Sequence, residues 1–376
     1  MHVSLNSWHA YCTHTRLTGT GDNKGGKKEE VARLVETLAL GSVGKSTQKN
    51  YLAKWNTWVK ERKAQGKGPW LHTLNDPNEA LTEVLEFMTS RCFVHNNQQS
   101  TVRGYLAAIN FFHKMFAGWE LPMSHCMIVA VGKGIDRAHG MSQKKKQVRL
   151  PLTWAILAQG RQAVVSMEDG GYVMWLGLAV SYFLLCRASE LWAYANGQVH
   201  PEFCLTRNCL SFFHGEVQVA FEKRSIATAV QVTFLASKCD QKRAGCTITR
   251  TRLEKEKETG GASMGAFEAL LELLNVYPLL PAEAPLTVRS TPFGWKVFTR
   301  TEAVAALRFM VGSSGRDPMQ FALHSGRIGG GTQLASQGIS ELQIQRAGRW
   351  KSRAFMTYVR EAGEGANSVS AALAKT

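Results

Sequence analysis

The chain contains 376 residues, 44% of them hydrophobic, and carries a formal net charge of +16 at pH 7. This length and apolar content allow sizeable cores in two or three domains, which excludes a disordered chain and a small disulfide-stapled one. The excess of Lys and Arg favours nucleic acid as a partner, because clustered cations release counterions from a polyanion. A merely soluble, basic surface is the alternative.

The eight cysteines are scattered along the chain, which is typical of a reducing compartment. Four potential metal ligands lie close in sequence, but their gaps differ from zinc-site spacing and they flank strand-like residues, so we expect no metal. These residues are His200, Cys204, Cys209 and His214. Residues 1–16 have no continuous apolar core, so we expect neither a secretory signal nor a membrane anchor.

The N-terminal part of the chain predicts a leader followed by a helical domain. Residues 19–30 are rich in Gly and Lys, and we expect a flexible leader over 1–28. Apolar residues then recur at helical spacing, which indicates four or five helices over 29–141. The expected helix caps are Ser46 with Thr47, Asp76 with Pro77, and Ser100 with Thr101.

A basic linker is expected over residues 142–153. Its cations are Lys144, Lys145, Lys146 and Arg149. No acid occurs between Asp136 and Glu168, so this hinge can lie along DNA phosphates. A solvated basic loop is the simpler alternative, and the three lysines also fit a nuclear localisation patch.

The remaining residues, 154–376, predict a mixed α+β domain. The uncharged stretch 170–186 is short for a membrane span and indicates a buried helix. Alternation and helical spacing predict strands over 217–223, 230–237 and 246–250, and helices over 266–277 and 301–312. The fold class that follows is mainly α with a small antiparallel β-sheet.

Two pairs of polar residues at i,i+3 spacing are candidates for a site. His324 and Arg327 share one helix face, and the glycines at 329–331 permit close backbone packing, which has to offset about 1 kcal/mol of lost helix propensity per glycine. Arg187 and Glu190 form the second pair, directly after the most apolar helix. An arginine placed there needs a partner or a ligand anion, and its fork of donors suits phosphate.

These residues resemble the tyrosine recombinases and integrases, whose catalytic domain carries an Arg, a Lys on a β-hairpin, H-x-x-R, a His or Trp, and a Tyr. The phrase HSGRIGGGTQLASQG at 324–338 is similar to the family's second arginine region, and GRWKSRAFMTY at 348–358 is similar to the members called cryptons. The matching positions are Arg187, Lys238, His324, Arg327, Trp350 and Tyr358, with Glu190 as an auxiliary group. The resemblance implies a helical, SAM-like core-binding domain over 29–141 that clamps duplex DNA together with an α+β catalytic domain over 154–376.

The resemblance also implies DNA strand exchange through a covalent 3'-phosphotyrosyl link, without metal, ATP or another cofactor. Tyr358 is the expected nucleophile, and Arg187 and Arg327 clamp the nonbridging phosphate oxygens. Trp350 stands where histidine is commoner and would help to hold the phosphate. The interval of eight residues from Trp350 to Tyr358 is one shorter than is usual for the family.

Protonation of the 5' leaving oxygen needs a general acid. Lys238 is the expected acid, because neighbouring cations lower the pKa of an ammonium group, and Lys242 on the same turn is the alternative. His324 and Glu190 are expected to orient the other groups.

The implied partner is double-stranded DNA, on which the family resemblance suggests a homotetramer. The cations expected to contact DNA are Lys144, Lys145, Lys146, Arg149, Lys242, Arg243, Arg349 and Lys351. Two other functions stay open at this point. One is a type IB topoisomerase-like enzyme that only relaxes supercoils, and the other is a DNA-binding protein that keeps the fold without catalysis.

Overall fold

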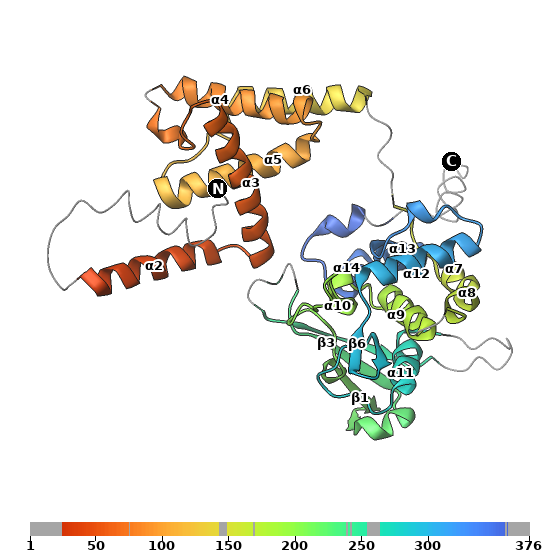
Figure 1. Ribbon diagram of the computed structural model, residues 1–376. Helices are drawn as coiled ribbons and strands as arrows, with labels where there is room; N and C mark the ends of the chain where they lie inside the picture. The colour runs from red at the N-terminus through yellow and green to blue at the C-terminus, as the bar shows by residue number, and fades with distance from the viewer. Residues whose placement is uncertain are drawn as a thin grey trace. The chain divides into compact units, whose positions relative to one another are not determined.

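The computed structural model describes residues 25–74, 76–142, 149–167, 170–237, 240, 243–253, 264–357 and 359. Two compact units divide the chain between residues 146 and 147. We call the described residues 25–142 the helical unit and the described residues from 149 onward the mixed unit. In Figure 1 the helical unit runs from red to yellow and the mixed unit from yellow-green to blue.

The helical unit contains a series of α-helices joined by short connections. They are α2 (Gly25–Gly41), α3 (Lys45–Ala64), α4 (Pro77–Thr89), α5 (Gln99–Ala117) and α6 (Cys126–Ser142), with a 3-10 turn at Leu71–Thr73 and a π turn at Ser90–Val94. Helix α2 starts inside the segment that we expected to be a flexible leader. The physical reason is that strong helix formers dominate residues 27–40, and they outweigh the glycines before them.

Only one of the three expected caps is present as a side-chain hydrogen bond. The Asp76 side chain accepts from the Asn78 N–H at 2.8 Å at the start of α4, with Pro77 in the first turn. Helices α3 and α5 instead begin after Gly44 and Gln98, neither of which provides a side-chain cap. Both helices extend N-terminally past the expected caps, so these residues lie within the first turn: Ser46, Thr47, Ser100 and Thr101.

Aromatic side chains from α3, α4 and α5 fill the core of the helical unit. The Trp55 ring stacks on Phe112 with centroids 4.8 Å apart, and Trp58 meets the Phe87 ring edge-on at 5.0 Å. Trp55, Trp58 and Phe112 belong to the apolar faces that the helical spacing predicted, as do Val84 and Met88 on α4, so that prediction is confirmed. Phe87 is a further core residue outside the predicted face of α4.

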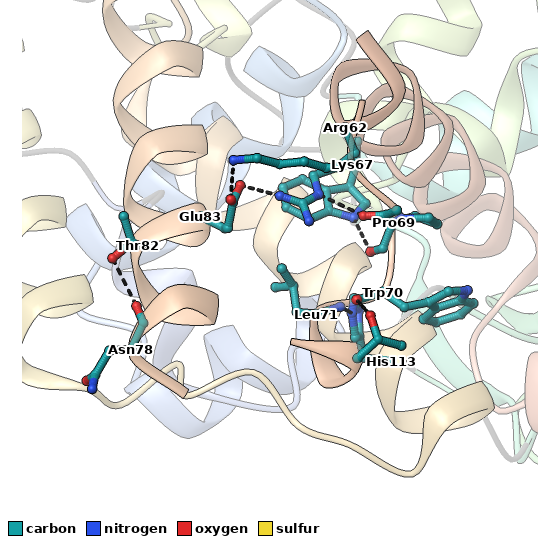
Figure 2. A network of polar contacts seen from close by, with 12 residues as sticks. Arg62, Lys67, Pro69, Trp70, Leu71, Asn78, Thr82, Glu83 and His113 are labelled. Carbon is teal, nitrogen blue, oxygen red and sulfur yellow. Dashed lines mark hydrogen bonds and ion pairs between the residues drawn. The ribbon is translucent and has the colours of Figure 1, made fainter. Parts of the chain in front are cut away.

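A buried carboxylate joins α3 to α4 (Figure 2). Glu83 accepts hydrogen bonds from both Arg62 and Lys67, and Arg62 also donates from Nε to the Gly68 carbonyl at 2.8 Å. Burial alone would raise the pKa of Glu83, but the hydrogen bond from Lys67 and the charge of Arg62 lower it overall. Glu83 is therefore ionised, and removing one of its partners would leave a buried charge unpaired.

His113 on α5 is completely buried beside this network (Figure 2). One ring nitrogen, Nε2, accepts from the Leu71 N–H at 3.0 Å, and the other, Nδ1, lies 2.9 Å from the Ile109 carbonyl. This arrangement requires the neutral imidazole, with its proton on Nδ1. Burial lowers the pKa of His113 to about 4.

The His113 site predicts a loss of stability in mild acid. The unfolded chain binds a proton near pH 6.5 and the folded chain only near pH 4, so the stability present at pH 7 is lost as pH falls through this window, by about 3 kcal/mol. We expect His113→Gln, which keeps a donor and an acceptor but does not titrate, to flatten this part of the pH profile. Urea unfolding of the full chain at several pH values measures the difference. An unchanged slope would contradict a neutral buried His113.

The mixed unit is built around α9 (Gly171–Phe183), which lies among its other helices in Figure 1. Eleven of its thirteen residues are buried, and it packs against α8, α11, α12 and α13. The buried helix expected over 170–186 is therefore confirmed. Across the described part of the chain, no helix combines the length and the apolar character needed to cross a membrane.

Helices enclose α9 before and after a strand-rich middle. They are α7 (Trp154–Gln159), α8 (Arg161–Val165), α10 (Ala188–Leu191), α11 (Ala266–Val276), α12 (Arg300–Ser313), α13 (His324–Ser336) and α14 (Glu341–Ala347), with 3-10 turns at Arg207–Cys209, Phe221–Ile226, Pro318–Gln320 and Arg353–Thr357. The helices expected over 266–277 and 301–312 correspond to α11 and α12.

A four-stranded antiparallel sheet occupies the middle of the mixed unit, in the order β2-β1-β3-β4. Its strands are β1 (Leu210–His214), β2 (Val217–Val219), β3 (Ala229–Phe234) and β4 (Cys246–Thr251), and β5 (Val288–Thr291) forms a separate hairpin with β6 (Gly294–Val297). The expected strand at 246–250 is present as β4, and the one expected over 230–237 is present as β3 but ends at Phe234. The strand expected over 217–223 is wrong beyond residue 219, because Phe221 contacts the guanidinium groups of Arg207 and Arg224 at 4.0 and 4.3 Å and the chain turns there.

Candidate active site

The glycine-rich start of α13 packs directly on neighbouring backbone. A Cβ on Gly329 would lie 1.8 Å from the Leu152 carbonyl oxygen, and one on Gly330 would lie 2.7 Å from the Tyr182 oxygen. The expected close approach is therefore present at both positions, whereas Gly331 has only an ordinary contact, 3.6 Å from Trp350. Gly330 thus brings the middle of α13 against the end of α9, and Gly329 brings it against the segment before α7.

Arg327 lies in the first turn of α13 and is almost completely buried, with 1% of its surface exposed. It donates from Nη1 to the Leu185 carbonyl and from Nη2 to the Gly348 carbonyl at 2.5 Å, and its guanidinium lies 4.3 Å from the Trp350 ring. Burial, with the charges of Arg187 and Arg349, lowers the pKa of Arg327 to about 9. The guanidinium therefore stays charged at pH 7 in a site that favours an added anion.

Arg187 does not end α9, as its position after the apolar stretch suggested. Helix α9 stops at Phe183, the chain turns through Leu185 at φ 51°, and Arg187 becomes the N-cap of α10. Glu190, 1% exposed, accepts from the Arg187 N–H at 2.8 Å and from Arg187 Nη1 at 3.1 Å. The expected i,i+3 pair is thus an ion pair across the first turn of α10.

His324 opens α13 one turn before Arg327 and takes the same face. Burial lowers the pKa of His324, and the charges of Arg327 and Arg187 lower it further. The imidazole is therefore neutral at pH 7, so one of its nitrogens can accept a proton or a hydrogen bond.

Arg349 was expected to contact DNA, but its side chain points into the protein. It donates to the Glu190 carboxylate at 2.7 Å and to the Leu184 carbonyl at 2.9 Å, and only 4% of the side chain is exposed. Its guanidinium also lies 3.5 Å from the centre of the Phe234 ring. The Arg349 guanidinium is therefore paired within the protein, as that of Arg327 is, and the expected DNA contact of Arg349 stays a prediction.

The segment that leads to the expected nucleophile is anchored in this site. Phe355, 1% exposed, lies in the 3-10 turn Arg353–Thr357 with its ring centre 5.8 Å from that of Trp350. The Val359 N–H donates to the Phe355 carbonyl at 3.2 Å. Tyr358 itself lies outside the described residues.

The turn between β3 and β4, where the general acid was expected, faces the same segment. Asp240 in this turn accepts from the Gly245 N–H at 2.8 Å, which lowers the pKa of Asp240, and it lies 3.9 Å from Lys351 Nζ. A cavity of about 520 Å³ separates the two parts and is lined by Phe234, Asp240, Arg349, Trp350 and Lys351, among others. Lys238 and Lys242 lie outside the described residues.

The other expected DNA contacts have different surroundings. Arg243 is largely exposed and pairs with Glu202 at 2.8 Å, and Lys351 is exposed. Arg149 donates to the Met319 carbonyl, and the Leu152 N–H donates to the Ser325 carbonyl at 2.9 Å, so the end of the expected linker belongs to the mixed unit. The remaining expected contacts, Lys144, Lys145 and Lys146, lie outside the described residues.

Arg250 on β4 is a further cation of this site that the sequence analysis did not single out. It pairs in register with the buried Val230, and burial lowers its pKa, with an additional contribution from the charge of Arg349. The signal was present in the sequence: within CTITRT the alternation places Arg250 on the same sheet face as Ile248, which is buried. Across the described residues, no three His, Cys, Asp or Glu side chains converge as metal ligands would.

Comparisons with known proteins give structural likenesses alone. No protein-family model and no curated protein matches the chain. Among solved structures, the chain is similar to XerA recombinase, with 11% identity, a TM-score of 0.37, and 92% of this chain and 97% of that one covered. It is also similar to the Tn1549 transposon integrase in complex with circular intermediate DNA, with 13% identity, a TM-score of 0.45 and coverages of 81% and 90%. The chain is likewise similar to a lambda integrase dimer bound to a COC' core site, with 13% identity, a TM-score of 0.47, and 95% of this chain and 86% of that one covered.

The contrast between Gly329 and Gly331 is testable by matched substitutions. Gly329→Ala places a methyl group on the Leu152 backbone, which cannot move aside as a side chain can, so we expect a loss of about 3 kcal/mol of unfolding free energy. Gly331→Ala meets only an ordinary contact and gains helix propensity, so we expect no loss or a gain of up to about 1 kcal/mol. Urea unfolding of both variants provides the test, and equal stabilities would contradict the close packing of α13.

Proposed function

We propose that this protein is a site-specific DNA recombinase that cuts and rejoins strands through a covalent 3'-phosphotyrosyl link to Tyr358, without metal or ATP. The observation that carries the proposal is the cluster of Arg187, Arg327 and His324, drawn from segments more than 130 residues apart in sequence. Arg327 is buried, Arg187 is half-buried, and His324 is exposed at the surface of the cluster. Phosphoryl transfer needs positive charge arranged around the phosphate before reaction begins. A site with this excess of guanidinium groups is suited to a phosphodiester.

The chemistry divides among the residues as follows. The Tyr358 oxygen attacks phosphorus, the bond from phosphorus to the 5' oxygen breaks, and Arg187 and Arg327 neutralise the charge on the nonbridging oxygens. Lys238 gives its proton to the 5' oxygen. Because the phosphotyrosyl link keeps the energy of the phosphodiester, a 5' hydroxyl from another strand can reverse the steps and complete the exchange.

Neutral His324 and the indole of Trp350 complete the proposed phosphate site. His324 can hydrogen-bond the phosphate or accept the tyrosine proton, because burial and its cationic neighbours keep the ring unprotonated. The Trp350 ring lies against the Arg327 guanidinium, so it also fixes the orientation of that clamp. The helical unit is proposed to bind duplex DNA as the partner domain, in a homotetramer on the DNA.

Covalent trapping on nicked DNA tests the nucleophile. The nick lets the 5' fragment diffuse away after cleavage, so the protein–DNA adduct accumulates and can be located by mass spectrometry after denaturation. We expect an adduct on Tyr358 with DNA from the flanks of the protein's own gene, and none with Tyr358→Phe, which lacks the attacking oxygen. Strand-joining products then separate recombination from relaxation. Tight DNA binding without any adduct would favour the non-catalytic alternative.

The two clamp arginines are tested in the same assay. Removing one donor of such a site typically costs about 3 kcal/mol of barrier, so we expect Arg187→Ala and Arg327→Ala to slow adduct formation by a factor of about 100 or more. Arg327→Ala also removes two buried hydrogen bonds, so Arg327→Lys and a thermal melt serve as controls for folding. Wild-type rates in the folded variants would remove these arginines from the proposed mechanism.

A further inference from the structure

Arg349 occupies a place in the site that the proposed chemistry does not use. Its side chain reaches across from the turn after α14 to the turn after α9, where Nη1 bonds the Leu184 carbonyl at 2.9 Å and Nη2 bonds the Leu185 carbonyl at 3.4 Å. The Nη2 group also bonds Glu190 at 2.7 Å, while the buried Nε has no hydrogen-bond partner. The fork is therefore committed to one small region of the protein.

Glu190 receives Arg349 and Arg187 on the same carboxylate. Oε2 accepts from the Arg187 N–H and from Arg349 Nη2, and Oε1 accepts from Arg187 Nη1 at 3.1 Å. With 1% of its surface exposed, Glu190 has little water to replace these donors. The orientation of the Arg187 guanidinium is thereby coupled to that of Arg349.

We call the contacts of Arg349 with Glu190 and with the Leu184 and Leu185 carbonyls the Arg349 bridge. The backbone is strained at both of its ends. Arg349 has φ 55° and Leu185 has φ 51°, left-handed values that cost a residue other than glycine about 1 kcal/mol or more each. The Leu185 carbonyl accepts from both Arg327 and Arg349, so one strained peptide serves two arginines. The strained Arg349 lies between Gly348, whose carbonyl accepts from Arg327, and Trp350, whose ring faces the same guanidinium.

We infer that Arg349 is a positioning residue, which together with Glu190 locks the two phosphate-clamping arginines into one rigid unit and does not itself contact DNA. This inference rests on the proposed function. Through Glu190 the bridge fixes Arg187, and through the turn 348–350 it fixes the carbonyl and the ring that hold Arg327. The same turn precedes the 3-10 turn Arg353–Thr357 in the chain.

The alternative role, a direct phosphate contact by Arg349, makes opposite predictions. A residue that binds a DNA phosphate contributes to affinity and to its salt dependence, and lysine often substitutes for it in part. A positioning residue instead affects the rate of cleavage within the bound complex. The planar guanidinium of Arg349 makes several directed hydrogen bonds in that role, which the ammonium group of lysine cannot replace.

The experiment compares Arg349→Gln, Arg349→Lys and Glu190→Gln in the full chain with the control Arg289→Gln, which breaks another Arg–Glu pair of the mixed unit, 2.9 Å long and outside the site. DNA affinity is measured at several salt concentrations, and the rate of covalent adduct formation is measured at saturating protein. We expect the three site variants to keep the wild-type affinity and salt slope but to form adduct about 100-fold more slowly, and the control to cleave normally. The double variant Arg349→Gln with Glu190→Gln should be no slower than either single one, because the two residues act as a unit.

Reduced affinity with a shallower salt slope and an unchanged rate in the bound complex would overturn the inference and assign Arg349 to DNA. Wild-type cleavage rates in folded Arg349→Gln would also overturn it, while leaving the proposed function intact. If the wild-type protein forms no adduct, the proposed function fails, and the bridge is judged by thermal unfolding. In that measurement, the loss of stability in the double variant has to differ clearly from the sum of the losses in Arg349→Gln and Glu190→Gln. Equality of the two would reject the coupling.

Discussion

The carboxylate of Glu190 is the group on which the arrangement of the candidate site depends. The side chains of Arg327 and Arg349 are almost completely buried and that of Arg187 is half-buried beside them, so their like charges repel strongly. Among the described residues, Glu190 is the carboxylate that pairs with two of them directly. The cluster keeps an excess of positive charge after this pairing. Because unpaired charge is costly to bury, a bound anion would stabilise this cluster.

The glycines of α13 are the steric counterpart of this electrostatic arrangement. Arg327 reaches the Leu185 carbonyl because α13 approaches the end of α9 more closely than a side chain at Gly330 would allow, while Gly329 lets α13 pack on the Leu152 backbone. Three glycines weaken an isolated helix, but here the lost propensity is offset by burial of the helix against α9 and by the hydrogen bonds of Arg327. The position of the Arg327 charge therefore depends on the close backbone packing of α13.

Much of this organisation was readable from the sequence. The uncharged stretch 170–186 is short for a membrane span and indicated a buried helix, and α9 is one. The i,i+3 spacing also predicted that His324 would lie close to Arg327 and Arg187 close to Glu190. The burial of Arg349 was not readable, because it depends on a left-handed backbone and on a partner 159 residues away. The strand expected beyond Val219 is absent because Phe221 contacts Arg224 in its own 3-10 turn and Arg207 from an earlier segment, and these contacts override the local alternation.

The turn at residues 348–350 supplies the last pieces of the cluster, and it follows the other elements of the cluster in the chain. A ribosome synthesises α9, α10 and all of α13 before this turn. Until then Arg327 lacks the Gly348 carbonyl and Glu190 lacks Arg349, so the partly made site holds charges without their partners. Assembly of the arginine cluster is thereby tied to completion of the segment that carries the tyrosine, and a chain truncated before it would hold neither a closed cluster nor the expected nucleophile.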